Sequence, residues 1–272
     1  MAQRTISILG CGWLGMPLAK FLVRTNHQVK GSTPTESKLD SLKESGIKAY
    51  KIFLNPNIND DFQKEFFNSE ILIINFPPKR RDDIEDFHPK QFHSLIEQIN
   101  NSTITKVIFI SSTSVYANLN REVTEEDHQM PEKASGKALR KVEQMLCSES
   151  KFSTTIIRFG GLIGYDRKPG RFLSKMKTAI EGKSPVNLLH QDDCINIISH
   201  VIENNLWGEV YNACCPEHPT KKDFYEKAAA IGGFSLPNFK HSKNTFKIIS
   251  CEKLINTGFS FKYANPIDAL PF

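Results

Sequence analysis

The chain begins with a glycine pattern that is typical of phosphate-binding turns. Residues 6–15 read ISILGCGWLG, so Gly10, Gly12 and Gly15 have the spacing G-x-G-x-x-G. Between a strand and a helix, the first glycine permits a tight turn, the second lets a pyrophosphate approach the backbone, and the third lets helix and strand pack closely. The N–H groups and the positive dipole end of the helix then face the phosphates. The pattern predicts a dinucleotide site, with an ordinary tight turn as the alternative.

The end of the second apolar run bears on which dinucleotide would bind. An NAD-selective site usually places Asp or Glu there, on the ribose hydroxyls of the adenosine. This chain has Gly-Ser-Thr-Pro-Thr at residues 31–35, with Lys38 nearby. Because the hydroxyls of Ser32 and Thr33 and a cation leave room for a 2′-phosphate, we predict NADP, while Glu36 keeps NAD possible. The same hydroxyls also suit a helix cap, and the two roles are compatible.

The segments that would position these residues alternate between strand-like and helix-like patterns along the first 165 residues. Apolar runs predict strands at residues 5–9, 27–33, 47–54, 70–76, 106–112 and 154–160, and helical patterns lie between them at 13–23, 35–46, 60–69, 87–100 and 133–146. Such alternation predicts an α/β fold with a doubly wound, Rossmann-type parallel sheet. The ligand crevice would lie beyond the carboxyl ends of the strands. We therefore assign to the cofactor site Gly10, Gly12, Trp13, Leu14, Gly15, Ser32, Thr33, Asn75, Phe76 and Ser111.

The pattern changes after residue 165. A Pro/Gly turn precedes a predicted helix at 171–181, a short apolar run at 186–189, a helix at 192–204 and a strand within 208–215. We therefore expect a dinucleotide-binding domain at 1–165 and a small α+β substrate part at 166–272, interleaved with the last elements of the sheet.

Composition restricts the class of partner. The 272 residues are 39% hydrophobic and 24% charged, and the net charge of +5 is scattered along the chain. We expect a small-molecule substrate, no nucleic acid and no membrane, in a monomer or homodimer. The six cysteines form no CxxC pair and no secreted-type framework, and no targeting segment is evident, so we expect reduced thiols in a cytoplasmic protein.

Five motifs occur in the order typical of one protein superfamily. Besides the glycine turn they are SSTSVYA (111–117), IIRFGGLIG (156–164), NLLHQDDCINII (187–198) and GEVYNACCPEHPTKKDF (208–224). Over nearly its whole length the chain resembles the extended and atypical short-chain dehydrogenases/reductases, in the branch of NAD-dependent epimerases and dehydratases. The resemblance implies an NAD(P)-binding oxidoreductase acting on a small polar or sugar-derived carbonyl or alcohol.

The resemblance also implies roles for single residues. Ser112 falls where the family keeps the Ser or Thr that hydrogen-bonds the substrate oxygen at the reacting carbon, and this hydroxyl would polarise the bond during hydride transfer. A serine that only satisfies the local backbone is the alternative. Arg158 falls in the segment that passes the nicotinamide. His190 and Asp192 match a motif that is mostly structural, and since no matching ligand set accompanies them we expect no metal.

The chain departs from the family at the proton-transfer pair. The family has Tyr and Lys four residues apart, the Tyr eight residues before a glutamate that is here Glu143, and these two positions hold Ser135 and Leu139. Leu139 belongs to a helical stripe with Val142 and Leu146, so we expect it to face the core. Tyr116, a lysine or water would then have to supply the proton.

Two classes of function follow. We favour an NADP-linked reductase or epimerase-like enzyme, because Ser112 and the small C-terminal part indicate a retained substrate cleft. The alternative is a noncatalytic NADP-binding sensor or interaction protein that kept only the cofactor cleft. The PPKRRDD segment at 77–83 suits a phosphate contact in either class, or a solvated loop.

Overall fold

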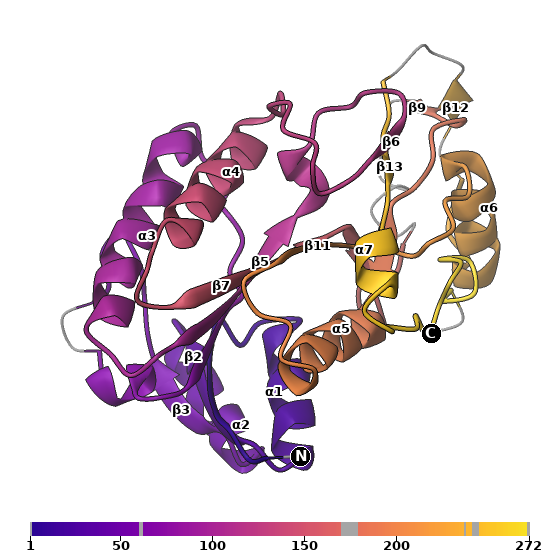
Figure 1. Ribbon diagram of the computed structural model, residues 1–272. Coiled ribbons are helices and arrows are strands. Elements are labelled where there is room, and N and C mark those ends of the chain that lie inside the picture. The colour runs from indigo at the N-terminus through magenta and orange to yellow at the C-terminus, as the bar shows by residue number, and fades with distance from the viewer. Residues whose placement is uncertain (1, 60–61, 170–178, 237, 241–244, 271–272) are drawn as a thin grey trace. The chain divides into compact units, whose positions relative to one another are not determined.

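A seven-stranded sheet is the largest element of the fold (Figure 1). The computed structural model describes residues 2–59, 62–169, 179–236, 238–240 and 245–270. The strand order is β11-β7-β5-β4-β1-β2-β3. β1 pairs in parallel with β2 and β4, β2 with β3, and β4 with β5. The predicted Rossmann-type α/β sheet is therefore confirmed.

Each of the six apolar runs predicted before residue 165 contains one strand of this sheet, and the strand predicted within 208–215 contains the seventh. The strands are β1 (Thr5–Leu9), β2 (Gln28–Thr33), β3 (Lys48–Lys51), β4 (Ile71–Ile74), β5 (Lys106–Ser112), β7 (Ser153–Phe159) and β11 (Val210–Ala213). All four residues of β4 are buried, as expected of a central parallel strand that is covered on both faces. In the described part of the chain, shorter strands form three pairs. These are β8 (Gly161–Ile163) with β10 (Leu188–His190), β9 (Ile180–Glu181) with β12 (Phe239–Lys240), and β6 (Glu122–Val123) with β13 (Ile248–Ile249).

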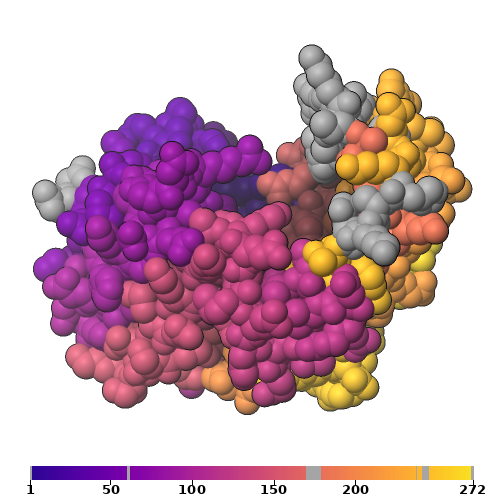
Figure 2. All heavy atoms as spheres, turned by 90° about the horizontal axis from the view of Figure 1, so that it is seen from above, coloured from indigo at the N-terminus to yellow at the C-terminus, as the bar shows by residue number. Residues whose placement is uncertain are grey.

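Helices lie on both faces of the sheet. The described part of the chain contains α1 (Gly15–Arg24), α2 (Leu39–Glu44), α3 (Ile84–Asn100), α4 (Ala134–Cys147), α5 (Gln191–Glu203), α6 (Lys221–Gly232) and α7 (Glu252–Ile255). Figure 1 shows α1 and α2 on one face and α3 and α4 on the other, and the segments of α3 and α4 adjoin in Figure 2 as well.

A proline inside α3 is accommodated by a neighbouring helix. Pro89 has no N–H, so the carbonyl of Glu85 loses its helical donor. The Nζ of Lys141 on α4 donates to that carbonyl at 3.2 Å. The contact links α3 to α4 where α3 lacks a backbone hydrogen bond.

Two predicted helices differ from the structure. In the region 60–69, residues 60–61 lie outside the described part, and the rest contains only a short 3-10 turn, η2 (Lys64–Phe67). The reason is that side chains of neighbouring strands use its carbonyls: Ser7 Oγ donates to Phe66 O at 2.6 Å, and Lys30 Nζ to Glu65 O at 2.7 Å. Of the predicted helix at 171–181, residues 171–178 lie outside the described residues, and Ile180–Glu181 is strand β9, paired with β12.

The chain divides into two compact units. The first comprises residues 1–115, 131–157 and 198–210, and the second comprises 116–130, 158–197 and 211–272. These units differ from the predicted ranges, because 116–130 and 158–165 belong to the second unit and 198–210 to the first. Compactness does not test which part binds a substrate, so the functional division at residue 165 stays a prediction.

The state of the cysteines and the apolarity of the helices can be compared with the sequence-based expectations. All six cysteines are free thiols, and Cys214 and Cys251, whose Sγ atoms lie 3.4 Å apart, are hydrogen-bonded without a disulfide. Within the described ranges, no helix combines the length and the apolarity that crossing a bilayer requires.

Candidate dinucleotide and substrate site

The three glycines of the turn have different surroundings. Gly10 has a φ of 108°, and a Cβ placed on it would lie 2.5 Å from the carbonyl oxygen of Asn75. A Cβ on Gly15 would lie 2.2 Å from the carbonyl oxygen of Gly10. A Cβ on Gly12 would meet no protein atom within 4 Å. The fold therefore requires glycine at 10 and 15, whereas the space beside Gly12 is open to a ligand.

Side chains from two strand ends hold this turn in place. Gly10 N–H donates to Ser32 Oγ at 3.2 Å, and Cys11 N–H donates to the Ser32 carbonyl at 2.8 Å. Asn75 Nδ2 donates to the Gly10 carbonyl at 3.0 Å. The side chain of Ser32 is buried, so its hydroxyl acts within the turn. The structure thus brings together the predicted residues at the ends of β1, β2 and β4.

Four further predicted residues flank the turn. Trp13 is half-buried, and Leu14 is buried at the start of α1. Thr33 is buried, and its Oγ1 accepts the N–H of Thr35 at 3.2 Å. This is a local turn contact and not the helix cap considered as an alternative, because neither the 3-10 turn Glu36–Lys38 nor α2 has a side-chain cap hydrogen bond. The ring of Phe76 stacks on Phe92 of α3 with 5.3 Å between centroids. Their predicted contacts with a cofactor stay predictions.

The end of β5 is fixed by α4. Ser111 Oγ donates to Glu143 Oε1 on α4 at 2.6 Å. Ser112 is half-buried, and its Oγ accepts the N–H of Ser114 at 3.2 Å. A Cβ on Gly136 would lie 2.2 Å from the Ser114 carbonyl, so the first turn of α4 packs directly against the turn that follows Ser112. Ser112 is therefore a partly exposed residue at a strand end that α4 holds in place.

The orientation of α4 agrees with the periodicity of its sequence. Leu139, Val142 and Leu146 are buried, and Ser135 is half-buried at the start of the helix. The predicted core position of Leu139 is confirmed. A lysine at this position would place an ammonium group in the core.

Tyr116 and Arg158 belong to a buried polar cluster of the second unit. The hydroxyl of Tyr116 donates to Asn212 Oδ1 at 2.7 Å and accepts from Arg158 Nη1 at 2.5 Å. Glu125 Oε1 accepts the N–H of Asn212 at 2.7 Å. Burial raises the pKa of Tyr116 to about 12, so this phenol holds its proton firmly. The surroundings suit a structural role, and the predicted catalytic and cofactor roles of these two residues stay predictions.

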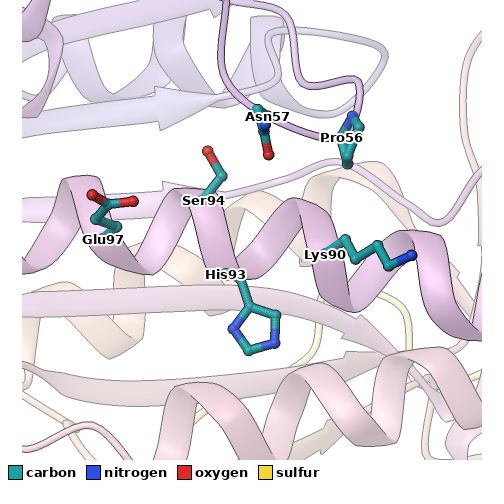
Figure 3. Close-up of a pocket in the computed structure, with 6 residues that line it drawn as sticks. All are labelled: Pro56, Asn57, Lys90, His93, Ser94 and Glu97. Carbon is teal, nitrogen blue, oxygen red and sulfur yellow. The ribbon is translucent and has the colours of Figure 1, made fainter.

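An open groove lies elsewhere in the first unit (Figure 3). Its volume is about 480 Å³, and it is lined by Pro56, Asn57, Lys90, His93, Ser94 and Glu97. Ser94 Oγ accepts the N–H of Ile58 at 3.2 Å, and Figure 3 shows the His93 ring pointing away from the turn that carries Asn57. None of these lining residues belongs to the predicted site.

A histidine beside Phe76 gives the first unit a testable pH dependence. His88 is fully buried between aromatic rings, with its Nδ1 3.0 Å from Gln91 Oε1. Gln91 Nε2 donates to the Leu54 carbonyl, so Oε1 is the acceptor and Nδ1 carries the hydrogen. Burial lowers the pKa of His88, although its hydrogen bond to Gln91 acts in the opposite direction.

We expect His88 to make the protein less stable in mild acid. Between its lowered pKa and the ordinary value of about 6.5, the unfolded chain binds a proton that native His88 does not, so stability falls as the pH falls through this window. His88→Asn keeps a donor for Gln91 but does not titrate. Urea unfolding at several pH values should therefore show a smaller loss in the variant, and an equal loss would contradict the prediction.

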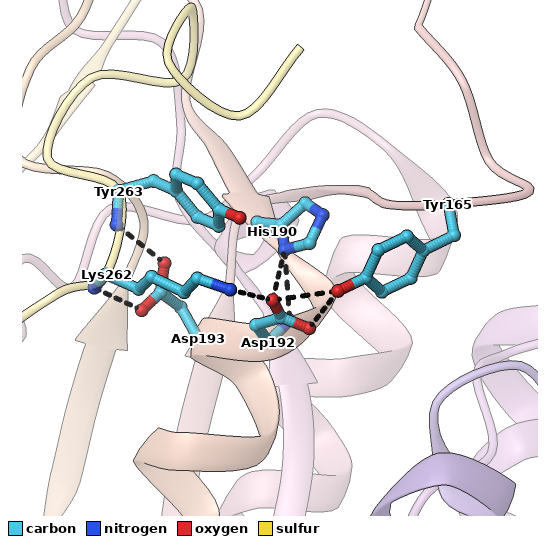
Figure 4. Close-up of polar contacts among 6 residues, drawn as sticks. All are labelled: Tyr165, His190, Asp192, Asp193, Lys262 and Tyr263. Atoms are coloured by element: carbon cyan, nitrogen blue, oxygen red, sulfur yellow. Dashed lines mark hydrogen bonds and ion pairs between the residues drawn. The ribbon is translucent and has the colours of Figure 1, made fainter. Parts of the chain in front are cut away.

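A second polar cluster surrounds the start of α5 in the second unit (Figure 4). Asp193 accepts the backbone N–H groups of Lys262 and Tyr263 at 2.7 and 3.2 Å. Asp192 accepts from Lys262 Nζ at 2.6 Å and from the Tyr165 hydroxyl at 3.0 Å. Burial acts to raise the pKa of Asp192, but the hydrogen bonds from Lys262 and Tyr165 lower it overall.

Sequence reasoning missed three members of this cluster, Tyr165, Lys262 and Tyr263. Tyr165 follows directly after the IIRFGGLIG motif, which is the only signal that marks it. Lys262 has no local signal, because only the fold brings it to α5. Within the described residues, no group of three or more potential ligands could hold a metal ion.

The chain is similar over nearly its whole length to a protein of Escherichia coli and to solved structures. No profile of a known protein family matches it. Protein YeeZ of Escherichia coli (strain K12) is 33% identical over 270 residues, which cover 97% of this chain and 98% of that protein. A UDP-glucuronic acid 4-epimerase from Bacillus cereus in complex with NAD has a TM-score of 0.79 at 19% identity, over 98% of this chain and 96% of that chain. A short-chain dehydrogenase/reductase superfamily protein from Agrobacterium tumefaciens with bound NAD has a TM-score of 0.79 at 15% identity, over 98% and 94% of the two chains.

Proposed function

The chain belongs to the family of Protein YeeZ and has the short-chain dehydrogenase/reductase fold, and from these premises we propose that it binds a nicotinamide dinucleotide. The observation that carries this proposal is the turn at Gly10, Gly12 and Gly15, where only Gly12 borders open space. The backbone N–H groups at the start of α1 are then suited to bind a pyrophosphate. The two similar structures with NAD support the same class of ligand.

We propose further that NADP is preferred. Ser32 and Thr33 are buried, whereas residues 34–38 are all exposed at the end of β2. We therefore assign the contact with a 2′-phosphate to Thr35 and Lys38, which present a hydroxyl and an ammonium group to solvent. The sequence alone assigned the 2′-phosphate contact to the hydroxyls of Ser32 and Thr33 together with Lys38, and the burial of Ser32 and Thr33 is the reason for the change.

The proposed activity is an oxidoreductase or epimerase-like reaction on a small polar or sugar-derived carbonyl or alcohol. A bound nicotinamide would supply or accept the hydride. Ser112, which is partly exposed, would hold the substrate oxygen through its hydroxyl, because α4 fixes the end of β5 through Glu143 and Gly136. Tyr116 is the least suitable of the three proton sources, since its hydroxyl is buried between Asn212 and Arg158. Water or an exposed lysine fits the role better.

One observation favours a noncatalytic protein as a second candidate. Leu139 is buried, and the resemblance to the short-chain dehydrogenases/reductases implies that Ser135 and Leu139 stand where those enzymes have their Tyr and Lys. A positioned proton donor typically contributes about 10²–10⁴ in rate, so its loss would suit a dinucleotide sensor.

Turnover of Ser112→Ala separates these two candidates. We expect the unaltered protein to oxidise NADPH with some member of a panel of aldehydes, ketones and nucleotide sugars, and Ser112→Ala to be slower by about 10²-fold at an unchanged affinity for NADPH. Ser114→Ala, in the same turn, is the matched control. Dinucleotide binding without turnover on the panel would favour the sensor, and turnover that Ser112→Ala leaves intact would contradict the role of Ser112.

A further inference from the structure

An ion pair links the carboxyl ends of β2 and β3. Thr33, the last residue of β2, is in register with Lys51, the last residue of β3. The Nζ of Lys51 lies 2.9 Å from Glu36 Oε2, within the exposed β2–α2 turn (residues 34–38). Lys51 thus reaches the segment to which the 2′-phosphate contact was assigned, although it lies 13 residues beyond that segment in the chain.

The pairing determines the charge that this turn presents. Glu36 is matched by Lys51, and Asp40, just beyond the turn, is matched by Lys43 at 3.0 Å. Among the described residues, no carboxylate lies within ion-pair distance of Lys38. Counted over the described residues, the turn and its partners therefore present one positive charge without a carboxylate partner, on Lys38. Without Lys51, the carboxylate of Glu36 would cancel it.

We propose that Lys51 is a specificity-determining residue that favours NADP over NAD. It holds the one carboxylate of the β2–α2 turn, which would otherwise repel a 2′-phosphate and accept hydrogen bonds from the ribose hydroxyls of NAD. Its ammonium group also adds positive charge beside the phosphate position. The inference rests on the proposed function, because it concerns the same dinucleotide site.

The test compares two lysines of one strand. Lys51→Met removes the partner of Glu36, and Lys48→Met is the matched control, because Lys48 pairs with Glu65 at the amino end of β3. We expect Lys51→Met to weaken NADPH binding by about three- to tenfold and to leave NADH binding unchanged or tighter, as measured by calorimetry. The effect should shrink in high salt, because both side chains are exposed. Lys48→Met should leave both affinities unchanged.

A second variant identifies the carboxylate as the cause. Adding Glu36→Gln to Lys51→Met should restore most of the NADPH affinity, since the repulsive charge is then gone. If the unaltered protein binds a dinucleotide and Lys51→Met keeps the same NADPH-to-NADH preference, the inference is wrong while the proposed function stands. If the unaltered protein binds neither dinucleotide, the proposed function fails and the inference fails with it.

Discussion

Gly12→Val is expected to weaken dinucleotide binding by at least about 100-fold while the protein stays folded. The branched side chain would enter the space in which a pyrophosphate meets the backbone N–H groups, and these charge-assisted hydrogen bonds would be lost. The fold itself tolerates the change, because a Cβ at Gly12 meets no protein atom within 4 Å and the residue has no left-handed φ. Calorimetric titration with NADPH, together with thermal unfolding, measures both quantities.

Gly15→Val provides the contrast that makes this result specific. Its Cβ would lie 2.2 Å from a backbone oxygen, that of Gly10, so neither partner can move aside without distorting the turn. We expect a loss of about 3 kcal/mol or more in unfolding free energy. Equal NADPH affinity in Gly12→Val and the unaltered protein would show that the turn is only a structural connection.

Leu139→Lys is expected to destabilise the protein by about 3 kcal/mol or more, although the resemblance to the short-chain dehydrogenases/reductases predicts a lysine at this position. Leu139 is 3% exposed, so the variant loses apolar burial and places an ammonium group in the core. Glu143 lies one helical turn further on, but its carboxylate already accepts from Ser111 and lies 3.7 Å from Arg140. Urea unfolding gives the free energy directly.

Leu139→Met is the control for volume, and we expect it to cost less than about 1.5 kcal/mol. Ser135→Tyr alone changes a half-buried residue in the first turn of α4 and tests the other position separately. A stable Leu139→Lys variant would mean that α4 accommodates a lysine at this position. In that event, the double variant Ser135→Tyr/Leu139→Lys becomes the direct test of whether the predicted loss of a Tyr and Lys pair limits turnover.

Periodicity and glycine spacing predicted the parts of the molecule that depend on local patterns. The alternation of apolar runs over the first 165 residues identified six strands of the sheet, the strand predicted within 208–215 was the seventh, and the stripe on α4 placed Leu139 in the core. Both follow from which faces of an element must be buried. The predicted helix at 60–69 was wrong over its described part because Ser7 and Lys30, from other strands, bind its carbonyls.

The residues that sequence reasoning missed are those brought into place by pairing over long distances. Lys51 reaches the β2–α2 turn only because β3 lies in register with β2. Lys262 reaches Asp192 from 70 residues further along the chain. Burial also makes two of the predicted residues less suited to contact a ligand, because Ser32 and Tyr116 are hydrogen-bonded inside the structure. No local pattern distinguishes a hydroxyl that faces solvent from one that holds a neighbouring turn.

The hydrogen bonds of Ser32 and Asn75 to Gly10 have a thermodynamic consequence. They restrain the glycine turn in the free protein, so a dinucleotide does not have to order this backbone as it binds. The conformational entropy that flexible glycines would otherwise lose on association has already been lost when the domain folds. Association at this turn is therefore expected to resemble docking onto a preformed surface, with similar amide hydrogen-exchange protection of Gly10 and Cys11 in the free and bound protein.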